Sequence, residues 1–173
     1  IIENTKIEEI KTVVFRQPVV FITGIDKETN EFYKKAREYF LNKKYEVVDY
    51  TFSLQEIFSW LNNNYDGNTY GETHIVSHGN PWKGLSMETL INGERVTTEH
   101  VRRAITMGKL PTLKEGISKK TKVVFHSCGL GENTDLMKTL KDAFVGEEVP
   151  SVLASPYYTI FGGEFSEHYL AKP

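Results

Sequence analysis

Two short segments, His78-Gly79 and Cys128-Gly129, contain the residue types of a thiol nucleophile and its base. A cysteine nucleophile needs a general base within hydrogen-bond reach and donors that stabilise the oxyanion. Imidazole is the usual base because it titrates near neutral pH. The glycine after each residue lets the backbone bend sharply and lets a substrate approach closely. The sequence therefore predicts cysteine-nucleophile chemistry, provided that the fold brings these two segments together.

The elements around these segments alternate between strand and helix. Continuous apolar runs predict buried strands at 19–23, 45–50, 72–77, 122–127 and 152–154. Amphipathic spacing predicts helices at 28–41, 54–61, 98–106 and 133–144. Ser53, with Glu56 three residues later, is expected to cap the second of these helices, and Asn92-Gly93 predicts a hairpin turn. This order predicts an α/β domain with a mainly parallel sheet flanked by helices on both faces. Because ligands bind at the carboxyl ends of such strands, we expect His78 and Cys128 to converge there.

Composition limits the classes of partner. The 173 residues are enough for a single domain, and 21 basic against 23 acidic residues give a net charge of −2. We therefore expect no nucleic-acid partner, and no membrane partner because no apolar run approaches the roughly 20 residues of a span. The single cysteine excludes an internal disulfide framework and a Cys-rich metal cage. The compartment, cytoplasmic or secreted, stays open.

The two segments resemble the conserved blocks of the caspase-like (clan CD) cysteine peptidases. Residues 75–79, Ile-Val-Ser-His-Gly, and 123–129, Val-Val-Phe-His-Ser-Cys-Gly, are similar to the strands that end in the family's histidine and cysteine. The caspase pentapeptide is absent, so the chain is no close relative of the caspases. By analogy of fold we expect a member of the bacterial branch, such as clostripain, gingipains and CHAT domains. The resemblance covers about residues 19–154. It implies a caspase-like fold, a peptide or protein substrate, and no cofactor or metal.

The resemblance also implies roles for individual residues. Cys128 would attack the peptide carbonyl and form an acyl-enzyme, and His78 would be the general base. The N–H groups of Gly79 and Cys128 would form the oxyanion hole. Asp26 and His126 would line the pocket for the residue before the cut, with Asp26 favouring a basic side chain. The open alternative is that Asp26 only caps a helix beginning near Lys27.

The resemblance further implies that the chain is incomplete. The family's domain normally continues past the fifth strand, whereas only residues 157–173 follow here. We therefore expect a C-terminally incomplete domain that belongs to a larger precursor, with a second subunit or further domains as partners. Residues 162–163 would lead toward a sixth strand.

Three other interpretations stay open. Residues 78–82 resemble an oxyanion-loop motif of some α/β-hydrolase esterases and dehalogenases, but residues 126–130 lack the glycines of a nucleophile elbow, and His168 is the only later histidine. Zinc could bind to histidine and cysteine side chains that share strand faces, namely His74, His78, His126 and Cys128. A catalytically silent protein-binding module could use the aromatic residues Trp82, Tyr157 and Tyr158.

Overall fold

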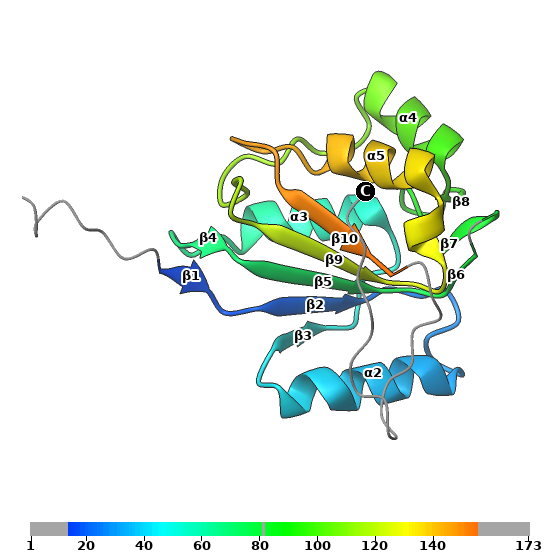
Figure 1. Ribbon diagram of the computed structural model, residues 1–173, viewed down its shortest axis with the longest axis horizontal. Helices are drawn as coiled ribbons and strands as arrows, with labels where there is room; N and C mark the ends of the chain where they lie inside the picture. The colour runs from blue at the N-terminus through cyan, green and yellow to red at the C-terminus, as the bar shows by residue number, and fades with distance from the viewer. Residues whose placement is uncertain (1–13, 81, 156–173) are drawn as a thin grey trace, which may run out of the picture.

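Five parallel strands form the centre of the fold (Figure 1). The computed structural model describes residues 14–80 and 82–155. The strand order is β10-β9-β5-β2-β3, and every neighbouring pair is parallel. Their bounds are β2 (Val19–Ile22), β3 (Glu46–Val48), β5 (Glu72–Val76), β9 (Lys122–His126) and β10 (Ser151–Ala154).

Helices cover the two faces of this sheet unequally. One face carries α2 (Glu31–Asn42), and the other carries α3 (Leu54–Asn63), α4 (Thr98–Thr106) and α5 (Thr134–Ala143) (Figure 1). The predicted α/β domain, with a mainly parallel sheet and helices on both faces, is confirmed. The chain passes from β2 outward to β3 and then returns past β2 to β5. The strand order therefore reverses at β2 and β5, and ligands of such sheets bind in the crevice at this kind of switch point.

Strands β2 and β5 contribute alternate residues to two separate apolar cores. Ile75, Val123 and Phe125 belong to the core under α3, α4 and α5. Val20, Ile22 and Val76 belong to a smaller core under α2. The alternation follows from the two-residue period of a strand. It also determines the sheet face on which each residue at a strand end lies.

The helix after β2 begins later than the sequence predicts. We expected a helix from residue 28, with Asp26 as a possible cap, whereas residues 26–29 form turns and α2 begins at Glu31. Asn30 is the N-cap, and its Oδ1 accepts the Phe32 N–H at 3.0 Å. The Asp26 carboxylate in turn accepts the Asn30 amide at 3.0 Å. The prediction that Asp26 caps the helix is therefore wrong, because the side chain that accepts a backbone N–H of the first turn is that of Asn30.

Other local predictions are confirmed. Ser53 caps α3, where its Oγ accepts the Glu56 N–H at 3.1 Å and the Glu56 carboxylate accepts the Phe52 N–H at 3.2 Å. Asn92-Gly93 lies in the turn of an antiparallel hairpin between β7 (Gly84–Glu88) and β8 (Arg95–Val96). Sequence patterns did not predict β6 (Gly79–Asn80), which adds a third strand to this hairpin. They also missed the short parallel pair of β1 (Phe15–Arg16) and β4 (Thr69–Tyr70) and the 3-10 turn η1 (Leu130–Glu132).

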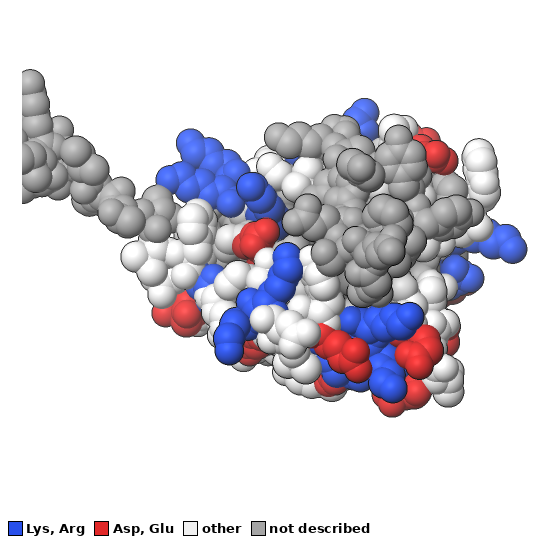
Figure 2. All heavy atoms as spheres, turned by 60° about the horizontal axis from the view of Figure 1, so that its bottom comes forward, with Lys and Arg blue, Asp and Glu red and all other residues white. Residues whose placement is uncertain are grey.

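Charges are mixed on the surface that carries α2. Basic and acidic side chains intermingle over this helix, with no broad field of one sign in this view (Figure 2). Arg37 of α2, for example, pairs with Asp49 at 3.0 Å. Within the described ranges, no helix combines the length and apolar character needed to cross a membrane. The predictions about Tyr157, Tyr158, His168 and residues 162–163 concern positions outside the described residues.

Candidate active site

The register of the sheet brings His78 and Cys128 to neighbouring strand ends. Strands β5 and β9 are adjacent, and their last paired residues are Val76 and His126. The ladder continues one step further, because the Ser77 N–H donates to the His126 carbonyl at 3.3 Å. His78 and Cys128 each lie two residues past that last pair. The sequence-predicted nucleophile and base therefore occupy equivalent positions at the carboxyl edge of the sheet, beside the switch point.

His78 lies on the sheet face that carries α2. The His78 ring stacks on Phe32 of α2 with centroids 4.4 Å apart and contacts Tyr33 edge-on at 5.0 Å. On β9, the His126 ring contacts Phe40 of α2 at 5.3 Å. His126 and His78 therefore lie on the same face of the sheet, and Cys128 follows in the turn after β9.

Cys128 lies in a tight turn directly after β9. The Leu130 N–H donates to the Ser127 carbonyl at 3.3 Å, and Gly129, at the third position of the turn, has φ 69° and ψ 5°. This is the left-handed conformation that a type II turn requires at that position and that glycine adopts without strain. The Gly131 N–H donates to the Ser155 carbonyl at 2.9 Å and so ties the turn to the end of β10. Cys128 is a free, half-buried thiol.

Two backbone N–H groups at this edge lack partners within the sheet. Gly79 of β6 faces Leu85 of β7, and the Ser86 N–H donates to the His78 carbonyl at 2.7 Å. In this antiparallel pattern Gly79 is a non-hydrogen-bonded position, so its N–H points away from β7. A Cβ at Gly79 would lie 3.0 Å from the Ser127 Cβ, which places Gly79 against the residue before Cys128. The Cys128 N–H makes no hydrogen bond among the described residues.

Asp26 lies in the turn between β2 and α2, on the same face as His78. It is exposed, and its carboxylate lies close enough to the Tyr33 hydroxyl to influence its titration. Burial raises the pKa of Tyr33, the hydrogen bond from the His78 N–H opposes that rise, and the Asp26 charge adds to it. Asp26 and the His78 backbone N–H therefore both lie near the Tyr33 hydroxyl.

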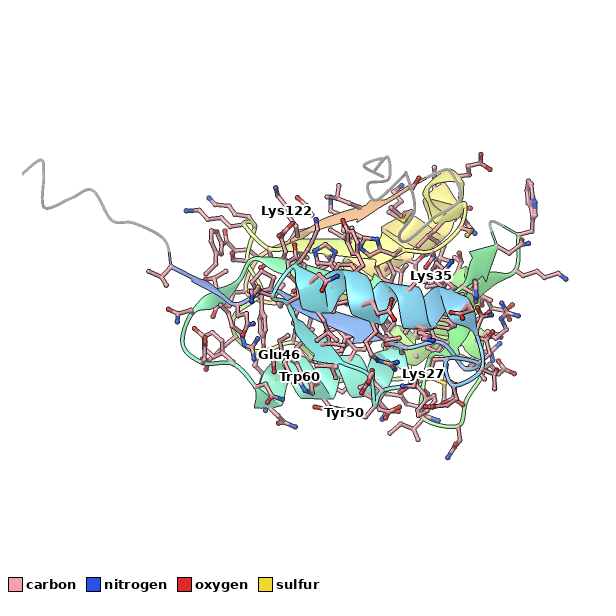
Figure 3. The ribbon with its side chains drawn as sticks, turned by 90° about the horizontal axis from the view of Figure 1, so that it is seen from below. Lys27, Lys35, Glu46, Tyr50, Trp60 and Lys122 are labelled. Carbon is pink, nitrogen blue, oxygen red and sulfur yellow. The ribbon has the colours of Figure 1, made fainter. Side chains whose placement is uncertain are left out.

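His126 lies deeper along the strand and pairs with a second histidine. Its Nε2 is 2.7 Å from the Nδ1 of His74, and the two rings stack at 5.0 Å with an interplanar angle of 19°. The pair borders a hollow of about 280 Å³ that extends toward the amino ends of the strands, lined by Tyr39, Phe40, Lys43, Tyr45, Glu72, His74, Lys122, Val124, His126 and Leu153. Figure 3 shows Lys122 at that amino edge and Lys27 near the opposite one. A role of His126 in the substrate pocket stays a prediction.

Glu72 is the acidic member of this hollow. His74 lowers its pKa most, with Nε2 3.8 Å from Oε1, and the Tyr45 hydroxyl, which donates at 2.9 Å, lowers it further. These effects outweigh the opposing influence of burial, and the pKa of Glu72 falls to about 2. In residues 14–80 and 82–155, no group of three or more His, Cys, Asp or Glu side chains has an arrangement that could hold a metal ion.

Sequence reasoning missed a buried lysine beside the site. Lys27 is 4% exposed, and its Nζ donates to the carbonyls of Ile22 at 3.2 Å, Thr51 at 2.9 Å and Asp49. Burial lowers its pKa. These contacts hold the loop that carries Asp26 against the ends of β2 and β3. The charged segment 26–28 gives no sequence signal for such burial, because lysines in this setting are usually solvated.

A second hollow lies between the β6–β7 turn and the start of α5. It has a volume of about 370 Å³ and is lined by Trp82, Glu132, Asn133, Thr134 and Asp135. Trp82, in the β6–β7 turn, is 87% exposed. The aromatic surface predicted at this residue is thus available to solvent.

The fold and site together define a layered α/β domain with a parallel sheet whose carboxyl edge carries a histidine and a cysteine on adjacent strands. Comparisons with models of protein families, with curated proteins and with solved structures found no match.

Proposed function

We propose that the protein is a cysteine endopeptidase of the caspase-like type. The observation that carries the proposal is the equivalent register of His78 and Cys128 at the ends of β5 and β9. The strand order, which numbers 2-1-3-4-5 along the chain, adds support because it puts His78 at the switch point. The resemblance of residues 75–79 and 123–129 to the family's two blocks supports the same assignment.

The reaction would proceed through an acyl-enzyme. His78 takes the thiol proton as the Cys128 sulfur attacks the peptide carbonyl, and the carbonyl oxygen becomes an oxyanion. The N–H groups of Gly79 and Cys128, which have no partner in the sheet, are the donors for that oxyanion. His78 then gives its proton to the leaving amine, and water hydrolyses the thioester. No step requires a cofactor.

Substitution of the two side chains tests the proposal. We expect Cys128→Ala and His78→Ala each to abolish cleavage of a mixed fluorogenic peptide library, since each removes a group that takes part in bond making. Thermal unfolding should change little, because Cys128 is half-buried and both residues lie at the edge of the sheet. His100→Ala is the matched control, because His100 lies on α4 and pairs with Glu94 at 2.6 Å, away from this edge.

Retention of cleavage in Cys128→Ala would contradict the proposal. A wild-type protein whose Cys128 reacts with thiol reagents but which cleaves no peptide would instead favour a silent binding module.

We further propose that Asp26 selects a basic residue before the cut. Its carboxylate is exposed and lies on the His78 face, and carboxylates form strong charge-assisted hydrogen bonds with arginine. A positional peptide library should show preference for Arg or Lys, and Asp26→Asn should reduce that preference about tenfold, as loss of one such contact predicts. Glu28→Gln, an exposed neighbouring carboxylate, is the control. A preference for Asp or Asn, or one unchanged by Asp26→Asn, would contradict this assignment.

A further inference from the structure

Two consecutive aromatic residues in the first turn of α2 hold His78 from different directions. The Phe32 ring lies over the imidazole with centroids 4.4 Å apart and planes 27° from parallel. The Tyr33 hydroxyl accepts the backbone N–H of His78 at 2.8 Å. Phe32 therefore restricts the rotation of the ring, while Tyr33 fixes the backbone that carries it.

The position of this aromatic pair is itself well determined. Tyr33 is fully buried, and a side chain at Gly24 would collide with its hydroxyl, so the end of β2 is shaped around the tyrosine. The rings of Phe32 and Tyr33 contact edge-on at 5.2 Å. Asn30 caps the helix directly before them by accepting the Phe32 N–H at 3.0 Å. A capped helix packed on the sheet is a rigid support for a functional side chain.

Among the described residues, no acidic side chain makes a hydrogen bond to the His78 ring. In many nucleophile–base pairs a third group, often a carboxylate, hydrogen-bonds the imidazole and fixes its orientation. The His78 Nε2 is buried and has no hydrogen-bond partner among the described residues. Stacking can fix the plane of a ring and leave its nitrogens available for proton transfer.

We propose that Phe32 and Tyr33 are the positioning residues of His78 and take the place of an acidic third member. The inference rests on the proposed peptidase function. During the reaction His78 holds the thiol proton as an imidazolium, and its charge then faces the π surface of Phe32. A cation over an aromatic face is attracted to the ring, so the stacking stabilises the charged intermediate as well as the orientation.

Two substitutions separate the two contacts. Tyr33→Phe keeps the ring and removes the oxygen that accepts the His78 N–H, whereas Phe32→Leu keeps an apolar side chain and removes the π surface. We expect each to lower kcat by about 10- to 100-fold with KM changed less than about twofold, because small misplacement of a reacting group costs that much. Phe32→Tyr retains the stack and should restore activity. Tyr45→Phe, which removes one hydroxyl on the same sheet face, is the matched control.

A second measurement reports the His78–Cys128 pair without turnover. The rate of Cys128 alkylation should depend on pH differently in the wild type and in His78→Ala. The pH curves of Phe32→Leu and Tyr33→Phe should lie closer to that of His78→Ala than the wild-type curve does. The ring resonances of His78 in histidine-labelled protein should also move in Phe32→Leu, because the ring current of the stacked phenyl group is lost.

The outcomes distinguish this inference from the proposed function. If wild type and His78→Ala alkylate with the same pH dependence and no peptide is cleaved, the peptidase proposal fails, and this inference fails with it. If cleavage requires His78 and Cys128 but folded Tyr33→Phe and Phe32→Leu retain wild-type kcat, only the positioning role is overturned. Tyr33→Phe preserves the buried ring, so it decides the question alone if Phe32→Leu does not fold.

Discussion

The two faces of the parallel sheet bury different kinds of side chain. Under α3, α4 and α5, strands β5 and β9 place Ile75, Val123 and Phe125 in a large apolar core. On the α2 face, the same two strands place His74 and His126 beside a smaller apolar cluster. A strand can thus devote one face to stability and the other to polar chemistry, because successive side chains point to opposite sides.

The two faces of the sheet depend on their side chains in different ways. The apolar core can be stabilised by any well-packed set of side chains of similar volume. The α2 face depends on particular partners, since a buried imidazole without a hydrogen bond is costly. Substitutions of comparable size on the two faces should therefore differ in both magnitude and additivity.

The largest effect on stability should come from the apolar face. Phe125 is fully buried and contacts Phe144 with ring centroids 6.2 Å apart. Phe125→Ala leaves a cavity and should lower the free energy of unfolding by about 3–5 kcal/mol, measured by urea titration. Val123→Ala and Val124→Ala remove the same two methyl groups on opposite faces, and Val123→Ala should cost more because Val123 belongs to the main core. Equal losses would contradict the assignment of the main core to the α3 side.

An intermediate effect is expected from the histidine pair. His74→Leu removes one partner of a buried hydrogen bond at 2.7 Å and should cost about 1–3 kcal/mol, as His126→Leu should. The double variant should be more stable than the sum of the single losses predicts, because neither polar group is then left behind. Urea titration of all four proteins gives the coupling free energy. Strict additivity would show that the two imidazoles do not stabilise each other.

The sequence predicted the strand ends better than the side chains that support them. His78 and Cys128 follow apolar runs whose ends are visible in the sequence, and parallel topology then brings the ends of these two strands to the same edge of the sheet. Tyr33 was not identified as a support for His78, because its contact depends on how α2 packs against β5. The His74–His126 bond was equally hidden, since it depends on the register between β5 and β9.

Local predictions failed where contacts with other segments decide the conformation. Strand β6 consists of Gly79-Asn80, which has low strand propensity and is extended because it pairs with β7. Lys27 is buried because three carbonyls from β2 and the segment after β3 surround its ammonium group. The burial of Lys27 depends on residues 22 and 24 positions later in the chain, and β6 depends on a hairpin pairing that its own two residues do not favour. The capping of α3, in contrast, was predictable because Ser53 and Glu56 act within one turn.

The smallest predicted effect is a pH dependence on the α2 face. The folded protein lowers the pKa of Glu72 from 4.5 to about 2, chiefly through His74, so the ionised carboxylate stabilises the native state. That contribution is complete above pH 4.5 and is lost as the pH falls through about 2, because the unfolded chain binds the proton more readily. The side chain is 47% exposed, so solvent and salt screen the interaction and the effect should be smaller than that of the histidine pair.

Glu72→Gln removes the titrating group and tests this dependence directly. Its unfolding free energy should fall less steeply than that of the wild type between pH 4.5 and pH 2, whereas Glu38→Gln, an exposed carboxylate on α2, should retain the wild-type slope. Added salt should reduce the difference between Glu72→Gln and wild type. If the two slopes agree at low salt, the Glu72–His74 contact does not stabilise the fold. The polar chemistry of the α2 face would then be confined to the histidine pair and the carboxyl edge of the sheet.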